Sequence, residues 1–290
     1  MTSQEIKDKY KLSEEEHMEI YKQIEQEVFG RVAPDSKPVA IIVGAQPGAG
    51  KGSIISYSKK QMEMEGKDIV IISTDEYKPY HPNAIEMSKK YPTEYIEIVE
   101  QDAGDWTSKV MKKAIEEKYN FIFEGTLKND RILRRIEELK ENGFEVVVRT
   151  LAVSKLESLI SIHERYESQI ENMGWGRLVS VEHHNRAYDG IPAVIDKIEK
   201  SKLCTTEVFI RGEEISSPKK VYSSKEDSNK YISARMALEE QRNIQQRNTA
   251  ITAEKRIKEI KQKFINRNAQ EKEMKQLEEL NELLKLEIER

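Results

Sequence analysis

The chain has 290 residues, of which 37% are hydrophobic and 34% are charged, and its 48 basic and 52 acidic residues give a net charge of -4. This length suits one α/β domain with extensions, and the balanced charge argues against a general electrostatic grip on nucleic acid. The single cysteine, Cys204, excludes an intrachain disulfide framework and a multi-cysteine metal site.

The first 18 residues are too polar for the apolar segment of a signal peptide, and no run of about 18 apolar residues occurs. We therefore expect a cytoplasmic protein that does not bind a membrane.

The first expected element is an amphipathic helix over 14–30, with Ser13 and Glu16 as a capping box. A buried strand follows at 39–45. Further strands are expected at 68–75, 121–126, 144–153 and 206–212, and helices at 53–64, 105–119, 130–143, 154–171 and 192–202. This alternation predicts an α/β fold in which helices cover both faces of a parallel sheet.

The composition changes after Pro218, because residues 219–290 contain neither Gly nor Pro. Two long solvated helices are expected there, with a narrow apolar stripe and a break around 267–271; the stripe comprises Ile257, Ile260, Phe264, Leu277, Leu280 and Leu284. They form either a hairpin partly docked on the core or a coil that self-associates or binds a partner. We thus divide the chain into an N-terminal helical segment (1–36), a central domain (37–222) and a helical extension (223–290) that contributes little to the core.

Residues 44–53, GAQPGAGKGS, have the form of a phosphate-binding loop between a strand and a helix. Such a loop directs backbone N–H groups at phosphate oxygens, which Gly48 and Gly50 permit because they lack a Cβ. Lys51 supplies the positive charge for the β- and γ-phosphates.

Two positions depart from the usual pattern, which has Gly at 45 and a hydroxyl at 52. Here Ala45 costs little if its φ is negative, and the hydroxyl comes one residue later, at Ser53, as in adenylate-type and related small-molecule kinases. We therefore predict a working site for ATP and Mg²⁺, with the metal at Ser53; its residues are Gln46, Pro47, Gly48, Ala49, Gly50, Lys51, Gly52 and Ser53.

Two carboxylates end neighbouring strands of the predicted sheet, Asp75 in STDEYKPYHPN and Glu124 in FEGT. Ligands of open α/β sheets bind at this edge. Asp75 is therefore either a carboxylate that holds magnesium or the general base for an acceptor hydroxyl. The alternative without a catalytic role is that Asp75 only caps a helix.

Two arginines lie near the last large helix expected in the sheet region. Arg165 is on the helix, and Arg177 is in a segment with Gly174 and Gly176. Flanking glycines suit a lid that closes over the phosphates, and the arginines would stabilise the migrating phosphoryl group. Taken singly, each is more often a surface ion pair.

Together, GAQPGAGK, STDEYKPYHPN, FEGT, ERYE and the spacing from Arg177 to His184 resemble the zeta toxin family over about residues 14–222. These are P-loop kinases of toxin–antitoxin systems that phosphorylate the 3′-hydroxyl of UDP-N-acetylglucosamine. The resemblance implies a P-loop kinase domain over 37–222, a UDP-sugar substrate and a cognate antitoxin.

The resemblance also implies roles for individual residues. Lys51 would bind the ATP phosphates, Asp75 would be the general base, and Arg165 and Arg177 would stabilise the transferred phosphoryl. The implied substrate-binding residues are Asp75, Tyr77, His81, Glu124, Thr126 and Lys128.

Many family members have Gly-Arg where this chain has Leu127-Lys128. The reaction type is therefore implied more strongly than the acceptor, which could be a nucleoside, another nucleotide-sugar or a dinucleotide. A third hypothesis, an interaction protein that works through its helical tail, would make Asp75 dispensable.

Overall fold

The computed structural model describes residues 1–127, 129–174, 176–212, 217–226 and 230–288. They form two compact units. The first unit comprises residues 1–41, 58–124 and 139–145, and the second comprises residues 42–57, 125–138 and 146–290.

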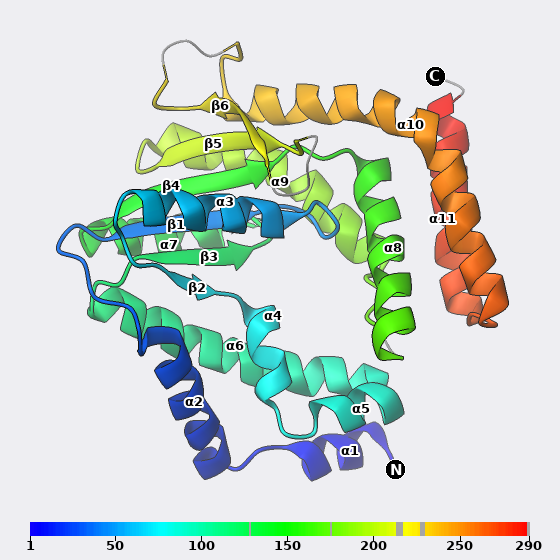
Figure 1. The fold of residues 1–290 in the computed structure, drawn as a ribbon, viewed down its shortest axis with the longest axis horizontal. Coiled ribbons are helices and arrows are strands. Elements are labelled where there is room, and N and C mark those ends of the chain that lie inside the picture. The colour runs from blue at the N-terminus through cyan, green and yellow to red at the C-terminus, as the bar shows by residue number, and fades with distance from the viewer. Residues whose placement is uncertain (128, 175, 213–216, 227–229, 289–290) are drawn as a thin grey trace. The chain divides into compact units, whose positions relative to one another are not determined.

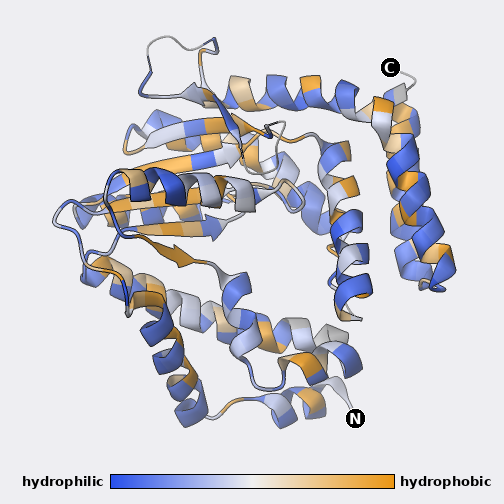
Figure 2. Ribbon diagram, in the orientation of Figure 1, coloured by the Kyte–Doolittle hydropathy of each residue, from blue (hydrophilic) through white to orange (hydrophobic). Residues whose placement is uncertain are grey.

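The strands form a six-stranded sheet in the order β2-β3-β1-β4-β5-β6 (Figure 1). Their bounds are β1 Val39–Gly44, β2 Val70–Ile72, β3 Phe121–Gly125, β4 Glu145–Leu151, β5 Thr205–Ile210 and β6 Lys219–Ser223. β2 pairs in parallel with β3, and β4 with β5, whereas β6 is antiparallel to β5. The predicted α/β class with a mostly parallel sheet is thus confirmed, and the antiparallel edge strand is an addition. The strands β1, β2, β3 and β4 are mainly hydrophobic in Figure 2.

The first unit is built around the long helix α6, Pro92–Glu116, with α1 Ser3–Tyr10 and α2 Glu14–Phe29 beside it (Figure 1). α2 begins with the predicted capping box of Ser13 and Glu16. Trp106 of α6 is fully buried and its indole N–H donates to the carbonyl of His17, 3.0 Å away. This bond and the apolar packing fix α2 on α6. The short elements α4 Thr74–Tyr77, η1 Lys78–Tyr80 and α5 Ala84–Lys90 precede α6.

The expected strand over 68–75 is wrong at its end, because β2 stops at Ile72 and α4 begins at Thr74. Asp75 and Glu76 lie in the first turn of α4, where the helix dipole favours acidic side chains. Asp75 therefore lies on a helical turn and not on a strand.

The second unit contains α8 Lys155–Met173, α9 Val181–Ser201, α10 Ala234–Asn266 and α11 Glu271–Ile288, and α11 lies alongside part of α10 (Figure 1). Two further helices, α3 Lys51–Met64 and α7 Arg131–Glu141, contribute residues to both units. The break expected around 267–271 is confirmed by the gap between α10 and α11.

The apolar stripe of α10 and α11 is buried, in agreement with the alternative of a hairpin docked on the core. All six of its residues are at most 5% exposed, and they share one hydrophobic core with Leu156, Leu159 and Ile160 of α8. Ion pairs flank this core, from Arg256 to Glu157 and Glu164. The extension is therefore part of the core of the second unit, because α8 offers a complementary apolar face. The boundaries at 36/37 and 222/223 stay predictions.

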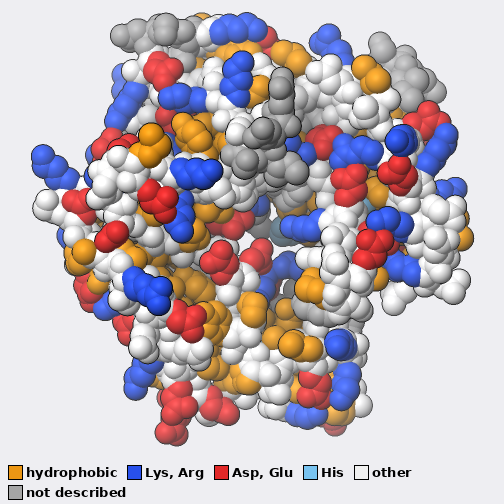
Figure 3. All heavy atoms as spheres, in the orientation of Figure 1, with side chains coloured by type: hydrophobic (Ala, Val, Ile, Leu, Met, Phe, Trp, Pro, Cys, Tyr) orange, Lys and Arg blue, Asp and Glu red, His pale blue; other side chains and the backbone are white. Residues whose placement is uncertain are grey.

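Basic and acidic side chains are interspersed on the face drawn in Figure 3, which agrees with the balanced composition. Within the described ranges, no helix combines the length and the hydropathy that crossing a membrane requires.

Candidate active site

The phosphate loop connects the end of β1 at Gly44 to the start of α3 at Lys51. Gly48 and Gly50 have φ values of 77° and 89°, in the left-handed region that L-residues avoid. A Cβ on Gly48 would lie 2.0 Å from the carbonyl oxygen of Ser158. Ala45 is not among the described residues with positive φ, so the condition under which alanine is tolerated there is met.

The start of α3 has the donors that a phosphate needs. The first N–H groups of a helix have no partner inside the helix, and α3 begins at Lys51, whose ammonium lies 3.5 Å from the carbonyl of Ala45. Ser53 donates its hydroxyl to the carbonyl of Gly50, 2.9 Å away. An added side chain at Gly52 would meet open space. These residues fit the phosphates of a nucleotide. The Ser53 hydroxyl lies in the first turn of α3, two residues after Lys51.

Arg211, which follows β5, holds the loop from the other side, and sequence reasoning missed it. Its guanidinium donates to the carbonyls of Gly48 at 2.5 Å and Ala49 at 3.1 Å, and it pairs with Glu157 at 2.7 Å. Because C=O and N–H of a trans peptide point in opposite directions, the bond to Ala49 turns the N–H of Gly50 away from Arg211. The loop amide is thereby aimed by a side chain outside the motif.

A second group of candidate residues lies in the first unit, around α4. Lys78 is 9% exposed, and its ammonium is 2.6 Å from Asp75 and 2.9 Å from Glu100 of α6. The side chain of Asp75 is 72% exposed. Asp75 is therefore open to a ligand and also held from beneath by a lysine that was part of the quoted motif but not assigned a role.

Glu124, at the end of β3, accepts a 2.9 Å hydrogen bond from the hydroxyl of Ser73. Burial is the main cause that raises the pKa of the neighbouring Glu76, and the charge of Glu124 is the second cause. Thr126 is partly buried, and Lys128 lies outside the described residues. The end of β3 and the turn after β2 are thus joined by a direct bond.

Leu127 has a φ of 51°, and its side chain is buried close to Gly44: a Cβ on Gly44 would lie 2.1 Å from the leucine Cγ. This left-handed φ is one that glycine adopts most readily. Leucine adopts it at a steric cost of about 1–2 kcal/mol and fills the space beside the start of the phosphate loop.

Tyr77 and His81 are buried, at 2% and 1% exposure. The Nδ1 of His81 accepts from the N–H of Asn83 at 3.2 Å, and its Nε2 lies 3.2 Å from the carbonyl of Tyr10. These bonds tie α1 to the turn that follows α4. Burial raises the pKa of Tyr77, whose hydroxyl stays protonated.

Arg165 is exposed on α8, and Arg177 is half-buried in the segment after it. Gly174 ends α8 with a φ of 74°, and the N–H of Arg177 donates to Gln169 at 3.0 Å. His184 on α9 is fully buried and bonds to the hydroxyl of Ser158 at 2.7 Å. Burial lowers the pKa of His184 to about 4, so it is neutral and structural.

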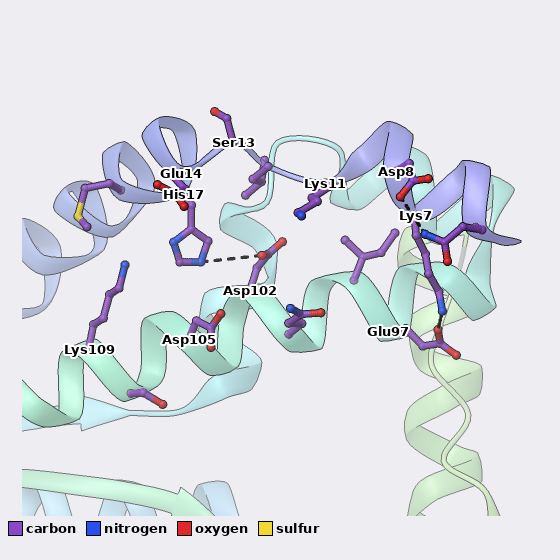
Figure 4. A pocket seen from close by; sticks show the side chains of 16 residues that line it. Lys7, Asp8, Lys11, Ser13, Glu14, His17, Glu97, Asp102, Asp105 and Lys109 are labelled. Atoms are coloured by element: carbon purple, nitrogen blue, oxygen red, sulfur yellow. Dashed lines mark hydrogen bonds and ion pairs between the residues drawn. The ribbon is translucent and has the colours of Figure 1, made fainter.

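The first unit also has a groove of about 870 Å³, lined by α1, α2 and α6 (Figure 4). His17 and Asp102 face each other across it at 3.8 Å, and Asp102 is 3.6 Å from His81. Burial is the main cause that raises the pKa of Asp102 to about 6, and the charge of Asp105 is the second cause. Sequence reasoning gave no signal for this groove. Among the described residues, no group of three or more His, Cys, Asp or Glu has the arrangement of a metal site.

The candidate residues thus form two sets. The first unit holds Asp75, Lys78 and Glu124 around α4, and the second holds the phosphate loop with Lys51 and, on or just after α8, the two arginines. A glycine-rich loop that joins a strand to a helix in a mostly parallel sheet defines the class of P-loop nucleotide-binding proteins, to which the P-loop kinases belong.

Comparison with known proteins identifies the family. The model of the zeta toxin family matches residues 24–227, so the chain belongs to that family. It is 33% identical over 151 residues to Toxin PezT of Streptococcus pneumoniae serotype 4, a match that spans 51% of this chain and 58% of that toxin. It is 26% identical over 250 residues to Toxin zeta of Enterococcus hirae, which covers 86% of this chain and 83% of the toxin.

A solved structure from the PezAT chromosomal toxin–antitoxin system of Streptococcus pneumoniae has the same fold. Its TM-score is 0.72 at 23% identity, over 86% of this chain and 98% of that chain. The family match ends at residue 227, before α10 begins at Ala234, whereas the similarity of fold extends over more of the chain.

Proposed function

We propose that this protein is an ATP- and Mg²⁺-dependent kinase that transfers the γ-phosphoryl group of ATP to a sugar hydroxyl of a UDP-sugar. The 3′-hydroxyl of UDP-N-acetylglucosamine is the first candidate, in keeping with the zeta toxin family. The observation that carries the proposal is the phosphate loop, with Gly48 and Gly50 in left-handed conformations directly before the start of α3. That backbone is what a nucleotide phosphate requires.

In this proposal Lys51 neutralises charge on the β- and γ-phosphates, and Ser53 turns its hydroxyl from Gly50 to the phosphate and magnesium. Magnesium, when bound, neutralises the charge that develops on the phosphates. Asp75 accepts the proton of the attacking hydroxyl, for which its exposure is suitable. Glu124 and Thr126, with Lys128, bind the acceptor, and Arg165 and Arg177 stabilise the migrating phosphoryl.

Tyr77 and His81 support the acceptor site indirectly in this scheme. Both are buried in the turn that carries Asp75, so we assign them the task of holding that turn in place.

A second acceptor class is favoured by one observation. Leu127 is buried beside Gly44 at a position where many relatives have glycine, and this changes the shape of the region expected to touch the acceptor. A nucleoside, another nucleotide-sugar or a dinucleotide is therefore the alternative substrate.

We also infer a toxin role with a cognate antitoxin protein as partner, since the matching relatives are toxins and one comes from a toxin–antitoxin system. Self-association through the C-terminal helices has less support, because their apolar stripe is buried against α8.

The test is incubation with ATP, Mg²⁺ and a panel of UDP-sugars, nucleosides and dinucleotides, with products read by mass spectrometry. We expect one phosphate to be added to UDP-N-acetylglucosamine. Phosphorylation of another panel member alone would move the protein to the second acceptor class, and ATP binding without any transfer would favour the interaction protein.

A further inference from the structure

The helix α10 reaches the phosphate loop through one buried side chain, Arg242. Its guanidinium donates to the side-chain carbonyl of Gln46, inside the loop, at 3.0 Å. It also donates to the backbone carbonyl of Tyr188 at 2.9 Å, and it lies 3.9 Å from the centre of the Tyr188 ring. Arg242 is only 3% exposed.

This arrangement is costly for folding alone. Both hydrogen-bond acceptors are neutral, and the Nε of Arg242 is buried without a partner. Burying a cation in this way costs several kcal/mol, which the neutral acceptors and the attraction of the Asp189 and Glu239 carboxylates offset only in part. Burial lowers the pKa of Arg242 to about 10, so the side chain stays charged at neutral pH. Because this buried charge does not maximise stability, we look for its role in the residue to which it hydrogen-bonds.

Gln46 is the residue that it holds, and Gln46 fixes the first turn of the loop. Its side-chain N–H donates to the carbonyl of Val153, just after β4, at 2.9 Å, so that both ends of the amide are engaged. Its backbone carbonyl accepts from the N–H of Ala49 at 3.2 Å, which closes the turn that contains Gly48.

A second path from α10 reaches the same loop. Arg256 pairs with Glu157 at 2.6 Å, and Glu157 pairs with Arg211, which bonds to the loop carbonyls of Gly48 and Ala49. Further contacts place α10 along the β4–α8 turn, including Gln246 to the N–H of Leu156 at 3.2 Å. The loop is therefore tied to α10 at both of its halves.

We propose that α10 is a structural part of the nucleotide site and that Arg242 is its positioning residue, which holds the phosphate loop in its binding conformation through Gln46. This inference rests on the proposed binding of nucleotide by the loop. It assigns a task to a helix that lies beyond the segment matched by the family model, and it replaces the expectation that the extension contributes little to the core.

The test compares Arg242→Lys with Arg267→Lys in the full-length chain. Arg267 lies at the C-terminal end of α10, where it pairs with Glu167 and Glu273, so its substitution is the same change on the same helix away from the loop. The affinity for ADP with Mg²⁺ is measured by calorimetry, at a temperature well below every melting transition. We expect Arg242→Lys to weaken binding about tenfold, and Arg267→Lys to change it less than twofold. An equal affinity of Arg242→Lys and wild type would overturn the proposal.

A double-mutant cycle with Gln46→Leu checks the route. We expect the double variant to bind ADP no more weakly than Gln46→Leu alone, since both changes break the same contact. Additive losses would contradict an action through Gln46. If Arg242→Lys does not fold, Arg242→Gln, which keeps an amide donor, takes its place.

Hydrogen exchange of residues 45–53 provides a readout that needs no nucleotide. We expect faster exchange there in Arg242→Lys than in Arg267→Lys, and unchanged protection would overturn the inference. If the wild type does not bind ADP, the proposed function fails, while the exchange experiment still decides whether Arg242 orders the loop.

Discussion

Lys78 bridges Asp75 and Glu100 at 2.6 and 2.9 Å while almost buried, so we expect it to set the position of the proposed base. Lys78→Met should lower kcat by about tenfold to a hundredfold, because small misplacements of a reacting group cost that much, and it should leave the affinity for ADP unchanged. Steady-state kinetics and calorimetry measure both quantities. Lys90→Met, which removes an exposed partner of Glu86, is the matched control, and an equal kcat in the two variants would exclude this role for Lys78.

The unusual end of the phosphate loop gives a second prediction for single residues. Ser53→Ala should weaken the use of Mg-ATP several-fold, because the only hydroxyl of this part of the loop is lost. Gly52→Thr should be tolerated, since an added side chain there meets open space. A titration of activity with magnesium separates the two variants, and the same magnesium dependence for Ser53→Ala and wild type would show that the hydroxyl has no such duty.

Two buried histidines predict how stability changes with pH. Burial lowers the pKa of His163 and of His184 to about 4 from the ordinary 6.5. Between pH 6.5 and 4 the unfolded chain therefore binds protons that the folded chain does not, and stability falls by about 1.4 kcal/mol per pH unit for each group. Asp102, with its raised pKa of about 6, offsets the loss of stability from one of these histidines below pH 6, because the protonated form of Asp102 is favoured in the folded state.

Urea unfolding at pH 7.5, 6 and 5 measures this dependence. His184→Gln should be destabilised at pH 7.5, since the bond to Ser158 changes, but it should lose less stability on acidification than the wild type. Parallel curves for the two proteins would mean that His184 is not held neutral.

The sequence identified the residues of the phosphate loop, because their spacing is local and the backbone requirement selects glycine. It could not identify Arg211 or Arg242. Arg242 belongs to a polar stretch that was expected to be a solvated helix, and only tertiary packing decides that it is buried. Arg211 stands at the end of the expected strand 206–212, and its partners Gly48 and Ala49 lie far away in the sequence. Lys78 was visible as part of a motif, but its two partners come from separate helices.

At the scale of elements, the core shared by α8, α10 and α11 gives a prediction for stability. Phe264→Ala should lower the free energy of unfolding by about 3–5 kcal/mol, because the ring is fully buried in that core. Ile265→Ala, one position along the same helix and 52% exposed, should change it by less than about 0.5 kcal/mol. For the same reason a chain ending at Ser224 should not fold cooperatively in its second unit. Similar unfolding curves for the two point variants would show that the extension is not part of this core.

Strands with β-branched apolar residues, such as 39–44 and 121–125, were predicted within one or two residues. The misses have physical causes. The short edge strand β6 begins with two consecutive exposed lysines and lacks an alternating pattern, so it is recognisable only by its pairing with β5. β2 was shortened by the helical turn at Thr74. The helices α10 and α11 were predicted, and docking on the core was one of the two alternatives given for them. The sequence could not decide between the alternatives, because an apolar stripe does not reveal its partner.

Across the two units of the chain, the proposed phosphoryl transfer depends on Lys51 and Asp75 for different reasons. Lys51 belongs to the unit with the phosphate loop, and Asp75 to the unit with α4. Loss of Lys51 removes charge stabilisation, worth about 10²–10³ in rate, and weakens the hold on the phosphates. Loss of Asp75 should remove the proposed base, worth about 10²–10⁴ in rate, and leave the phosphate loop intact.

The most direct test is single-turnover transfer of labelled γ-phosphate from ATP to the acceptor that the panel identifies, with the ADP affinity of each variant measured in parallel. Asp196→Asn serves as the control and should behave as wild type. It removes a carboxylate that pairs with Lys200 on α9. We expect Lys51→Ala to lose both transfer and affinity, whereas Asp75→Asn should lose transfer and keep its affinity for ADP. Normal transfer by Asp75→Asn would contradict the proposed mechanism.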